Sequence, residues 1–510
     1  MLLSELKKLT KHTAIYGIGT FASRSVGFFM LPVYTHFLLP SDYGILELID
    51  LTSFILIFVF SLALDKAVLR FYNLSDTDLD RKSVISSSIL LWHIYGLIVL
   101  LLILPLAGFF SITVIGSAEY SRLFLIAFIN VFLVSSFSLS KTILRAQNRS
   151  YVFTLYSLGY TFVAVIFNIL FIAILQVGVI GYLYATLIGS AVCGTILVCK
   201  LLKEVGFRID FAIFRQMLRY AIPFIPSSLL LFVLNWSDRY ILRLFRDLDE
   251  IGLYALGYKI GMVLVFLVVM PFDLIWSSYI FEASKKLDAK RIYTIFSTYF
   301  FFVTWLIGLG IAIFAEEIIS VMSDPKFYEA HRLVPIIILG MLFMTSIQIT
   351  RIGILIKGKS KFLPLANGIA AVLNILLNFF LIPKIGMYGA AITTAISFFV
   401  CTLLLFLMSQ RMYHIEFEYR RIAKIIGIAV GIFAVAYMVT SESLLVNVII
   451  KATLLLSFPI FLMLLRFYSD DEIFIIKKTT AAGLLSLRQR LILWSPWHVS
   501  DSDDARPDDD

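Results

Sequence analysis

Residues 387–409 read MYGAAITTAISFFVCTLLLFLMS, an unbroken run of 23 residues without a charged side chain. At 1.5 Å per residue, a helix of this length is about 34 Å long, and the hydrocarbon core of a bilayer is about 30 Å thick. The stretch is therefore predicted to cross a membrane as one helix. Thirteen further stretches contain about 20 or more mostly apolar residues and are predicted to cross the membrane in the same way.

The composition of the whole chain agrees with a membrane protein. Of its 510 residues, 60% are hydrophobic and 15% are charged, whereas soluble proteins carry roughly 45–50% and about 25%. The predicted fold class is an all-α integral membrane protein with 14 transmembrane helices. Their approximate ranges are 14–36, 45–64, 85–110, 122–144, 152–175, 180–202, 219–243, 252–280, 294–320, 333–356, 362–383, 387–409, 421–440 and 446–467.

The positions of Lys and Arg predict the orientation of these helices. If the N-terminus is cytoplasmic, 32 of the 43 basic residues fall in cytoplasmic segments, 7 in outer segments and 4 within spans. Such an excess of Lys and Arg in cytoplasmic loops is what the positive-inside rule describes. Both termini are therefore predicted to be cytoplasmic. Because the basic residues are spread over eight segments, no nucleic-acid partner is expected.

Two parts of the chain resemble each other. The segment 168–197 is similar to 378–405, and the loop 147–150 (Gln-Asn-Arg-Ser) is similar to 357–360 (Lys-Gly-Lys-Ser). The corresponding positions include Asn168 and Asn378, Gly178 and Gly386, and, in a weaker echo, Asp42-Tyr-Gly-Ile and Glu250-Ile-Gly-Leu.

The two copies are six helices apart, so they cross the membrane in the same direction. Parallel repeats are a standard plan of transporters, with the substrate path between the two halves. The predicted domains are an N-terminal six-helix bundle (1–203), a C-terminal six-helix bundle (204–410), two extra helices (411–468) and a cytoplasmic tail (469–510).

Three basic side chains lie at depths where a membrane does not readily tolerate an unpaired charge. Arg24 is close to the middle of the first span, Lys259 is two turns into the eighth, and Arg239 is in the outer third of the seventh. A charge at the bilayer centre costs about 2.5–3.5 kcal/mol on insertion scales. Each could bind an anionic group in a water-filled cavity or form a structural ion pair. For Arg24 the candidate partners are Glu47 and Asp50.

The acidic residues Glu47 and Asp50 are three positions apart and share one face of the second span. A carboxylate within a helical bundle can carry a proton or bind sodium. The two residues are therefore candidates for coupling transport to an H⁺ or Na⁺ gradient, although pairing with Arg24 explains them equally well. No other cofactor and no metal site are predicted, because the three Cys lie in apolar runs and the six His are scattered.

Several motifs carry a resemblance to a known family. The first span contains Pro32-Val-Tyr and leads into Leu39-Pro-Ser-Asp-Tyr-Gly44. The seventh contains Ser237-Asp-Arg-Tyr-Ile-Leu242, followed by Ile251-Gly-Leu-Tyr-Ala-Leu-Gly-Tyr-Lys259. With the fourteen helices and the repeat, residues 1 to about 468 resemble the polysaccharide-transport branch of the multidrug/oligosaccharidyl-lipid/polysaccharide (MOP) exporter superfamily, which contains the Wzx-type oligosaccharide flippases.

The resemblance implies a V-shaped bundle, like that of the MATE transporters, that moves an undecaprenyl-pyrophosphate-linked oligosaccharide from the inner to the outer leaflet of the cytoplasmic membrane. The product would be a surface polysaccharide such as the O-antigen of lipopolysaccharide, capsule or exopolysaccharide. It further implies a cationic central cavity, with Arg24, Arg239 and Lys259 as its candidates, and an ion gradient as the driving force. The implied partners are membrane lipids and the machinery that polymerises polysaccharides and sets their chain length.

Alternative functions remain open. A lipid II-type flippase needs the same chemistry for an anionic headgroup and differs from this interpretation only in the motif of the seventh span. A drug/cation antiporter of the same superfamily would need an acidic, aromatic pocket, whereas the deepest charge, Arg24, is basic. A membrane enzyme is disfavoured, because the longest outer loop, about 321–332, holds few candidate catalytic residues.

The end of the chain departs from the family pattern. Residues 477–494 can form a basic amphipathic helix on the inner leaflet. Residues 500–510 contain six Asp and are expected to be disordered. Neither segment indicates its role.

Overall fold

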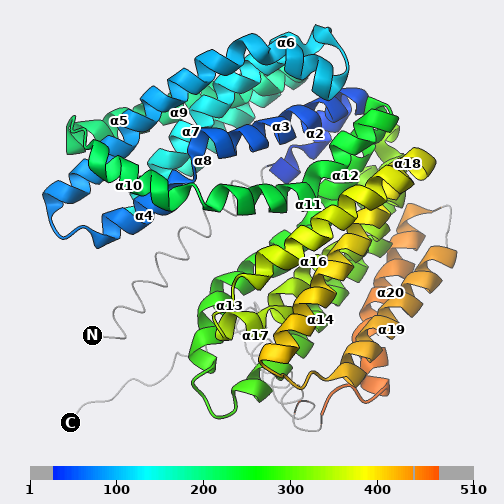
Figure 1. Cartoon of the computed structure of the whole chain (residues 1–510). Helices are drawn as coiled ribbons and strands as arrows, with labels where there is room; N and C mark the ends of the chain where they lie inside the picture. Colours follow the sequence, from blue (N-terminus) through cyan, green and yellow to red (C-terminus); the bar gives the residue numbers. More distant parts are fainter. Residues whose placement is uncertain (1–26, 440–442, 470–471, 473–510) are drawn as a thin grey trace, which may run out of the picture.

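A computed structural model describes residues 27–439, 443–469 and 472, and the regular elements in these ranges are all helices (Figure 1). The first half contains α2 (Leu31–Phe37), α3 (Pro40–Ser61), α4 (Leu64–Leu74), α5 (Asp78–Ile103), α6 (Ala107–Phe110), α7 (Ser121–Ala146), α8 (Ser150–Asn168), α9 (Val179–Val205) and α10 (Phe211–Ala221). The second half contains α11 (Phe224–Phe245), α12 (Leu248–Leu264), α13 (Met270–Ala283), α14 (Ala289–Ile313), α15 (Ala315–Met322), α16 (Val334–Thr350), α17 (Ile352–Ile356), α18 (Phe362–Met412), α19 (Tyr419–Met438) and α20 (Leu444–Leu464). Short 3₁₀ or π-helical turns join or extend several of them: η1 (Leu104–Leu106), η2 (Ser111–Ile115), η3 (Ala118–Tyr120), η4 (Ile169–Ile174), η5 (Val265–Val269) and η6 (Pro325–Arg332).

Twelve helical stretches of the described residues are long and apolar enough to cross a membrane. One of them, α18, has 51 residues, and its backbone is non-helical at Ile385 and Gly386, so it consists of two membrane-length helices. The first predicted span, 14–36, falls largely outside the described residues, which include only its end in α2. The all-α membrane fold is confirmed, and the count of fourteen helices stays a prediction.

The internal repeat is visible in the backbone. Gly178 has φ 70° and ψ −147°, and Gly386 has φ 54° and ψ −133°, a conformation that is essentially open to glycine alone. In the two similar loops, Asn148 (φ 58°) and Gly358 (φ 65°) are both left-handed. After each of them the next amide donates a hydrogen bond to the carbonyl five residues earlier: Arg149 to Leu144 (2.9 Å) and Lys359 to Ile354 (3.1 Å).

The helices form two groups, which together have the shape of a V (Figure 1). The first group contains α2 to α9 and the second α11 to α18. They meet where α3 and α12 begin and diverge toward the ends that carry α4, α10 and α13 (Figure 1). The packing of α3 against α12 is the most extensive contact between them. The predicted boundaries of the two six-helix bundles stay a prediction.

The chain passes from the first group to the second between α10 and α11. Helix α10 packs against α4 and α5, whereas α11 packs most extensively against α18. The break between them, at Ile222 and Pro223, lies within the predicted seventh span, 219–243. Proline cannot donate the backbone hydrogen bond that would continue a helix, which explains why one apolar stretch becomes two helices.

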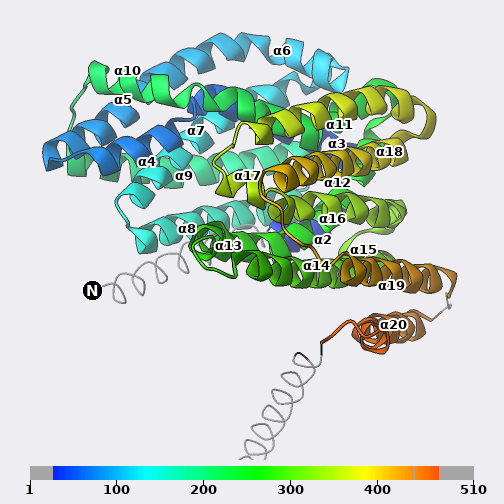
Figure 2. The same cartoon turned by 60° about the horizontal axis from the view of Figure 1, so that its bottom comes forward.

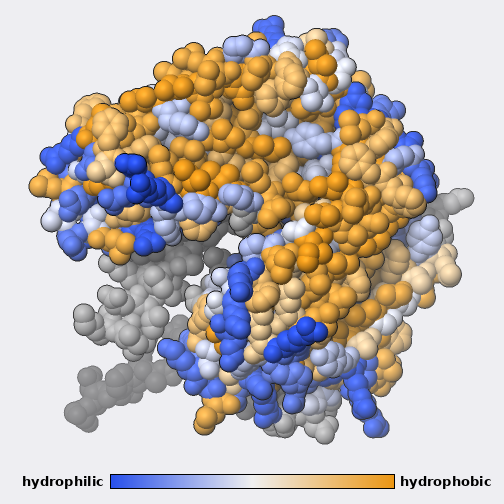
Figure 3. Space-filling model, in the orientation of Figure 1, coloured by the Kyte–Doolittle hydropathy of each residue, from blue (hydrophilic) through white to orange (hydrophobic). Residues whose placement is uncertain are grey.

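The last two described helices lie outside the second group. Helix α19 packs against α14, and α20 packs mainly against α19, so that α20 is outermost in Figure 2. Hydrophobic residues cover the sides of both groups in Figure 3, and hydrophilic residues gather toward the helix ends. This distribution matches a bilayer that surrounds the sides of the molecule.

Candidate functional site

A cavity of about 280 Å³ lies between the two groups. Nine of its twelve lining residues belong to the first group or to the residues just before α2. The other three are spaced by three and four residues along α12 and η5. Most of the lining is apolar or aromatic, and three of the residues carry a charge. The lining residues are Gly27, Phe28, Leu31, Tyr34, Tyr43, Leu46, Glu47, Asp50, Tyr182, Lys259, Met262 and Phe266.

Helix α3 supplies the acidic wall of the cavity. Tyr43, Glu47 and Asp50 are spaced by four and three residues, which places their side chains along one face of the helix. At the start of the helix, the Asp42 carboxylate accepts a hydrogen bond from the Leu39 amide at 3.1 Å. This bond fixes the first turn of α3 and thereby helps to set the face that the helix presents.

Lys259 faces this wall from α12. Its Nζ donates a hydrogen bond to Tyr43 Oη at 2.7 Å and lies 4.5 Å from the centre of the Tyr43 ring. Lys259 is exposed although residues 251–258 and Ile260 are buried, because it opens onto the cavity. An ammonium group has three donors, so this bond to a neutral hydroxyl leaves it able to bind an anion.

Asp50 is held within the first group. Tyr182 Oη, on α9, donates a hydrogen bond to Asp50 Oδ2 at 3.0 Å. The Tyr182 ring packs edge-on against the ring of Tyr34, with 5.8 Å between the ring centres. The tyrosines thus position a carboxylate in the cavity wall without neutralising it.

Arg239 lies behind the cavity wall rather than in it. Its side chain is fully buried, with Nη1 2.7 Å from Asp238 Oδ1 and Nε 3.6 Å from Glu47 Oε1. Its guanidinium carbon lies 4.0 Å from the ring centre of Tyr258 and 4.8 Å from that of Tyr254. Among the described residues, Nε and Nη2 have no hydrogen-bond partner. Glu47 therefore interacts with Arg239 as well as lining the cavity.

Asp238 joins three helices behind the same wall. Besides its pairing with Arg239 on α11, it accepts hydrogen bonds from Tyr254 of α12 at 2.5 Å and from Thr394 of α18 at 3.1 Å. A buried carboxylate with this many partners is stable, but the loss of Arg239 would leave its charge without an ion-pair partner.

The end at which α3 and α12 begin is closed by backbone contact. A Cβ atom on Gly44 would overlap the carbonyl oxygen of Leu248, and one on Gly252 would overlap that of Pro40. Residues without a side chain let two helices approach this closely. On the same side, Lys326 Nζ donates a hydrogen bond to the carbonyl of His36 at 3.2 Å.

The structure brings together three of the predicted site residues. Glu47, Asp50 and Lys259 line the cavity, and Arg239 does not. Arg24 lies outside the described residues; Gly27, three positions later, lines the cavity. Tyr43 and Tyr182 are cavity residues that were not among the predicted site residues. The position of Tyr43, one turn before Glu47, could have indicated it.

Residues 9–276, just over half of the chain, match a family that is described as "Polysaccharide biosynthesis protein". The chain belongs to this family. The match includes every residue that lines the cavity, as well as Arg24, Asp238 and Arg239.

Two curated proteins are similar to part of this chain. A probable low-salt glycan biosynthesis flippase, Agl15 of Haloferax volcanii, is 26% identical over 217 residues, which are 41% of this chain and 44% of the relative. An uncharacterized membrane protein of Methanocaldococcus jannaschii is 28% identical over 148 residues, 28% of each chain. The matched part thus spans less than half the length of either relative.

Solved structures share the fold over nearly their whole length. The lipid II flippase MurJ in an inward closed conformation has a TM-score of 0.73 at 17% identity, with 89% of this chain and 99% of MurJ covered. A multidrug resistance MATE family transporter of the MOP superfamily, in an inward-facing conformation, has a TM-score of 0.64 at 13% identity, with 81% and 96% covered. The predicted polysaccharide family and the predicted fold are confirmed, and the proteins with this fold are described as a flippase and a transporter.

Proposed function

We propose that this family member is a flippase for an anionic, lipid-linked oligosaccharide, and that the lipid is undecaprenyl pyrophosphate. The observation that carries the proposal is the position of Lys259. Its ammonium group opens onto a cavity between the two helix groups, and its hydrogen-bond partner there is a neutral hydroxyl. Charge-assisted hydrogen bonds to phosphate oxygens are among the strongest in proteins, so this is a suitable first contact for a pyrophosphate.

The size of the cavity suits a headgroup rather than a whole repeat unit. At about 280 Å³ it is at the lower limit of ligand pockets, which are roughly 300–1,000 Å³. The sugars and the lipid chain would then lie in the diverging space of the V and in the bilayer. Arg24, in the chain that leads to Gly27, is the second candidate for contact with the headgroup.

The direction of movement follows from the closed end of the V. The ends that diverge carry loops that are predicted to be cytoplasmic, and the opposite end is closed at Gly44 and Gly252. We infer that the structure corresponds to the inward-facing state of an alternating-access cycle in the cytoplasmic membrane, with both termini inside. The substrate would enter from the inner leaflet and leave after α3 and α12 separate.

Glu47 and Asp50 support coupling to an ion. Two like charges 4 Å apart repel by about 4 kcal/mol at an effective dielectric constant of 20. A pyrophosphate beside two carboxylates would therefore bind weakly unless a proton or sodium ion neutralised one of them. Asp50 is the better candidate, because Glu47 is engaged with buried Arg239. We propose no other cofactor, and the described residues hold no cluster of three potential metal ligands.

One observation favours a second candidate function, the export of a cationic compound. Among the described residues of the cavity, two carboxylates face a single ammonium group, and aromatic rings surround them. Such a lining is also suited to a cation. Lys259 separates the two candidates, because removal of its charge would weaken the binding of an anion and strengthen the binding of a cation.

The proposal is tested by binding. The purified chain in nanodiscs is mixed with undecaprenyl pyrophosphate and measured by native mass spectrometry. Lys259→Gln is expected to lower occupancy at least tenfold, whereas Lys384→Gln, an exposed lysine outside the cavity, leaves it unchanged. Equal occupancy in both variants would exclude Lys259 as the headgroup contact. Tighter binding of a cationic dye to Lys259→Gln, without a loss of lipid binding, would favour the second candidate.

The proposed partners follow from the substrate. Membrane lipids surround the helices, and a polymerase with its chain-length machinery would consume the exported unit. Which surface polysaccharide is built, whether O-antigen, capsule or another, depends on the sugar that the lipid carries.

A further inference from the structure

A group of six exposed lysines lies at the diverging end of the second helix group. Three are on the segment 285–290, which enters α14, and three are on the segment 357–361, between α17 and α18. Among the described residues, none of them has a carboxylate oxygen within 4.0 Å. We call them the lysine cluster: Lys285, Lys286, Lys290, Lys357, Lys359 and Lys361.

The two segments converge on one aromatic ring. Lys290 Nζ lies 5.6 Å and Lys357 Nζ 5.9 Å from the ring centre of Tyr413. A ring partly compensates a cation but does not neutralise it. The cluster therefore concentrates positive charge without an ion-pair partner among the described residues. This holds although acidic residues lie nearby in the chain: Asp288 in the first segment, Glu282 in α13, and Glu416 between α18 and α19.

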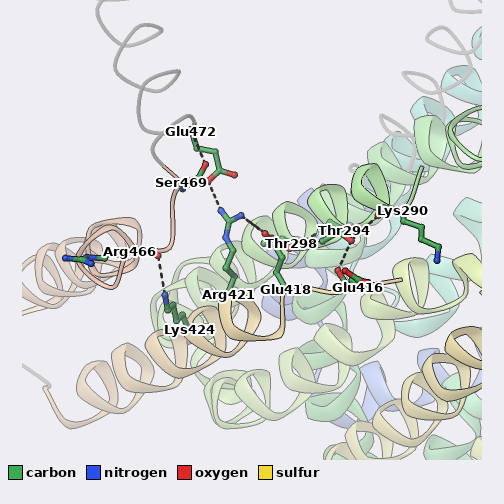
Figure 4. Close-up of polar contacts among 10 residues, drawn as sticks. All are labelled: Lys290, Thr294, Thr298, Glu416, Glu418, Arg421, Lys424, Arg466, Ser469 and Glu472. Carbon is green, nitrogen blue, oxygen red and sulfur yellow. Dashed lines mark hydrogen bonds and ion pairs between the residues drawn. The ribbon is translucent and has the colours of Figure 1, made fainter. Parts of the chain in front are cut away.

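The chain that follows α20 is brought to this same end of the molecule (Figure 4). Arg421 Nη2 donates a hydrogen bond to Glu472 Oε2 at 2.7 Å, and Arg421 Nη1 pairs with Glu418 at 3.1 Å. Glu418 in turn accepts a hydrogen bond from Thr298 of α14 at 2.7 Å. Thr298 is about 12 Å along the helix axis from Lys290. Residue 472 is thus fixed near the lysine cluster.

We propose that the acidic end of this same chain, residues 501–510, docks on the lysine cluster. The segment contains six Asp and one Arg, which complements six unpaired lysines. The 28 residues from 473 to 500 can span at most about 100 Å, and a helix over 477–494 would still contribute about 27 Å. Tethering makes the docking intramolecular, so contacts too weak to hold a free peptide hold the tail.

The docking itself does not depend on what the protein transports.

Carbodiimide crosslinking tests the docking directly, because it joins a lysine to a carboxylate only where the two are in contact. The full-length chain in nanodiscs of zwitterionic lipid is crosslinked, digested and analysed by mass spectrometry. We expect crosslinks from Asp residues of 501–510 to the lysine cluster and not to Lys200 and Lys203, which are exposed at the end of α9. A mixture of isotopically labelled and unlabelled chains distinguishes crosslinks within one chain from crosslinks between two chains.

Matched variants show whether charge holds the tail. Lys290→Gln together with Lys357→Gln should lower the crosslink yield at the other four lysines about threefold or more, and Lys200→Gln together with Lys203→Gln should not change it. An absence of crosslinks, equal crosslinking to Lys200 and Lys203, or crosslinks between chains would overturn the proposal. A loss of crosslinks in nanodiscs of anionic lipid would also overturn it, because the cluster would then bind the membrane.

Discussion

Gly44 of α3 and Gly252 of α12 occupy corresponding positions in the two repeats, and each touches the backbone of the other's helix. The two halves of the molecule therefore meet at equivalent points at one end of the V. Next to this contact lies the cavity with Tyr43 and Lys259. A transporter that alternates its access must separate these two helices, so the glycine contact and the charges beside it form one functional unit.

The glycine contact predicts the effect of a single methyl group. Gly252→Ala would force α3 and α12 apart and expose the cavity from the closed side. In a background without the native cysteines, Leu46→Cys should then react with a membrane-impermeant thiol reagent added outside. Gly368→Ala, at a helical glycine with nothing within 4 Å of its added Cβ, is the control. Unchanged labelling in Gly252→Ala would contradict the assignment of this end as the outer closure.

Tyr43 and Lys259 should differ sharply in their effect on the headgroup. Lys259→Gln removes the charge and should weaken binding of undecaprenyl pyrophosphate by about 10- to 100-fold. Tyr43→Phe removes only the hydroxyl that accepts from Lys259 at 2.7 Å, so it should change affinity less than about threefold. Native mass spectrometry measures both. Equal losses would mean that the pair acts structurally.

Arg239 should matter for stability rather than for substrate contact. Arg239→Gln leaves Asp238 and Glu47 with less compensation, and breaking a buried ion pair costs about 3–5 kcal/mol. The thermal unfolding midpoint in detergent should therefore fall markedly. Arg246→Gln, which breaks a half-exposed pair with Glu250, should change it little. A stable Arg239→Gln variant that no longer binds the lipid would contradict this role.

Asp50 should carry the coupling ion. Asp50→Asn keeps an acceptor for the hydroxyl of Tyr182 but cannot be protonated or bind sodium strongly. We expect that transport into proteoliposomes loses its stimulation by a pH or sodium gradient, while lipid binding persists. The exposed Glu119 provides the control, Glu119→Gln. If a gradient still stimulates transport in Asp50→Asn, Asp50 does not carry the coupling ion.

The attachment of the chain after α20 should depend on pH. Burial acts to raise the pKa of Glu472, but hydrogen bonds from the Ser469 amide, Tyr299 and Arg421 outweigh it and hold the pKa below the usual 4.5. Because the pKa of Glu472 is lower in the attached state, the charged carboxylate stabilises the attachment at pH values above the usual pKa of 4.5. This stabilisation is lost as the pH falls through the lowered pKa.

Hydrogen exchange at the Ser469 amide measures this attachment. After correction for the intrinsic effect of pH on exchange, protection should be constant from pH 7 to about 5 and should be lost as the pH falls through the lowered pKa of Glu472. Glu472→Gln should lack it already at pH 7. Protection at pH 7 that is unchanged in Glu472→Gln would show that the carboxylate does not hold this segment.

The membrane fold could be predicted because it follows from composition and periodicity. The sequence repeat could also be predicted. Asn148 corresponds to Gly358, and Gly178 to Gly386, and the residues of each pair have similar backbone angles. The break in the predicted seventh span could be predicted only in part. Pro223 and Pro226 indicate an interruption, but they do not reveal that α10 packs with the first group. That assignment depends on contacts between residues far apart in the chain.

The site could be predicted only in part, because depth along a helix does not give the direction of a side chain. Arg239 and Lys259 both lie in spans, yet Arg239 points at Asp238 and Lys259 opens onto the cavity. The spacing of Glu47 and Asp50 placed them correctly on one face. The hydroxyl partners Tyr43 and Tyr182 depend on how α3, α9 and α12 pack against one another, which no local pattern encodes.

The central claim, export of an anionic lipid-linked oligosaccharide, is tested most directly by the lipid pool of cells that lack this chain. Lipid-linked sugars are extracted and analysed by mass spectrometry, with the wild-type chain and Lys259→Gln supplied separately. We predict that complete undecaprenyl-pyrophosphate-linked repeat units accumulate without the chain, that the wild-type chain clears them, and that Lys259→Gln does not. An unchanged lipid pool together with greater sensitivity to cationic drugs would contradict the claim.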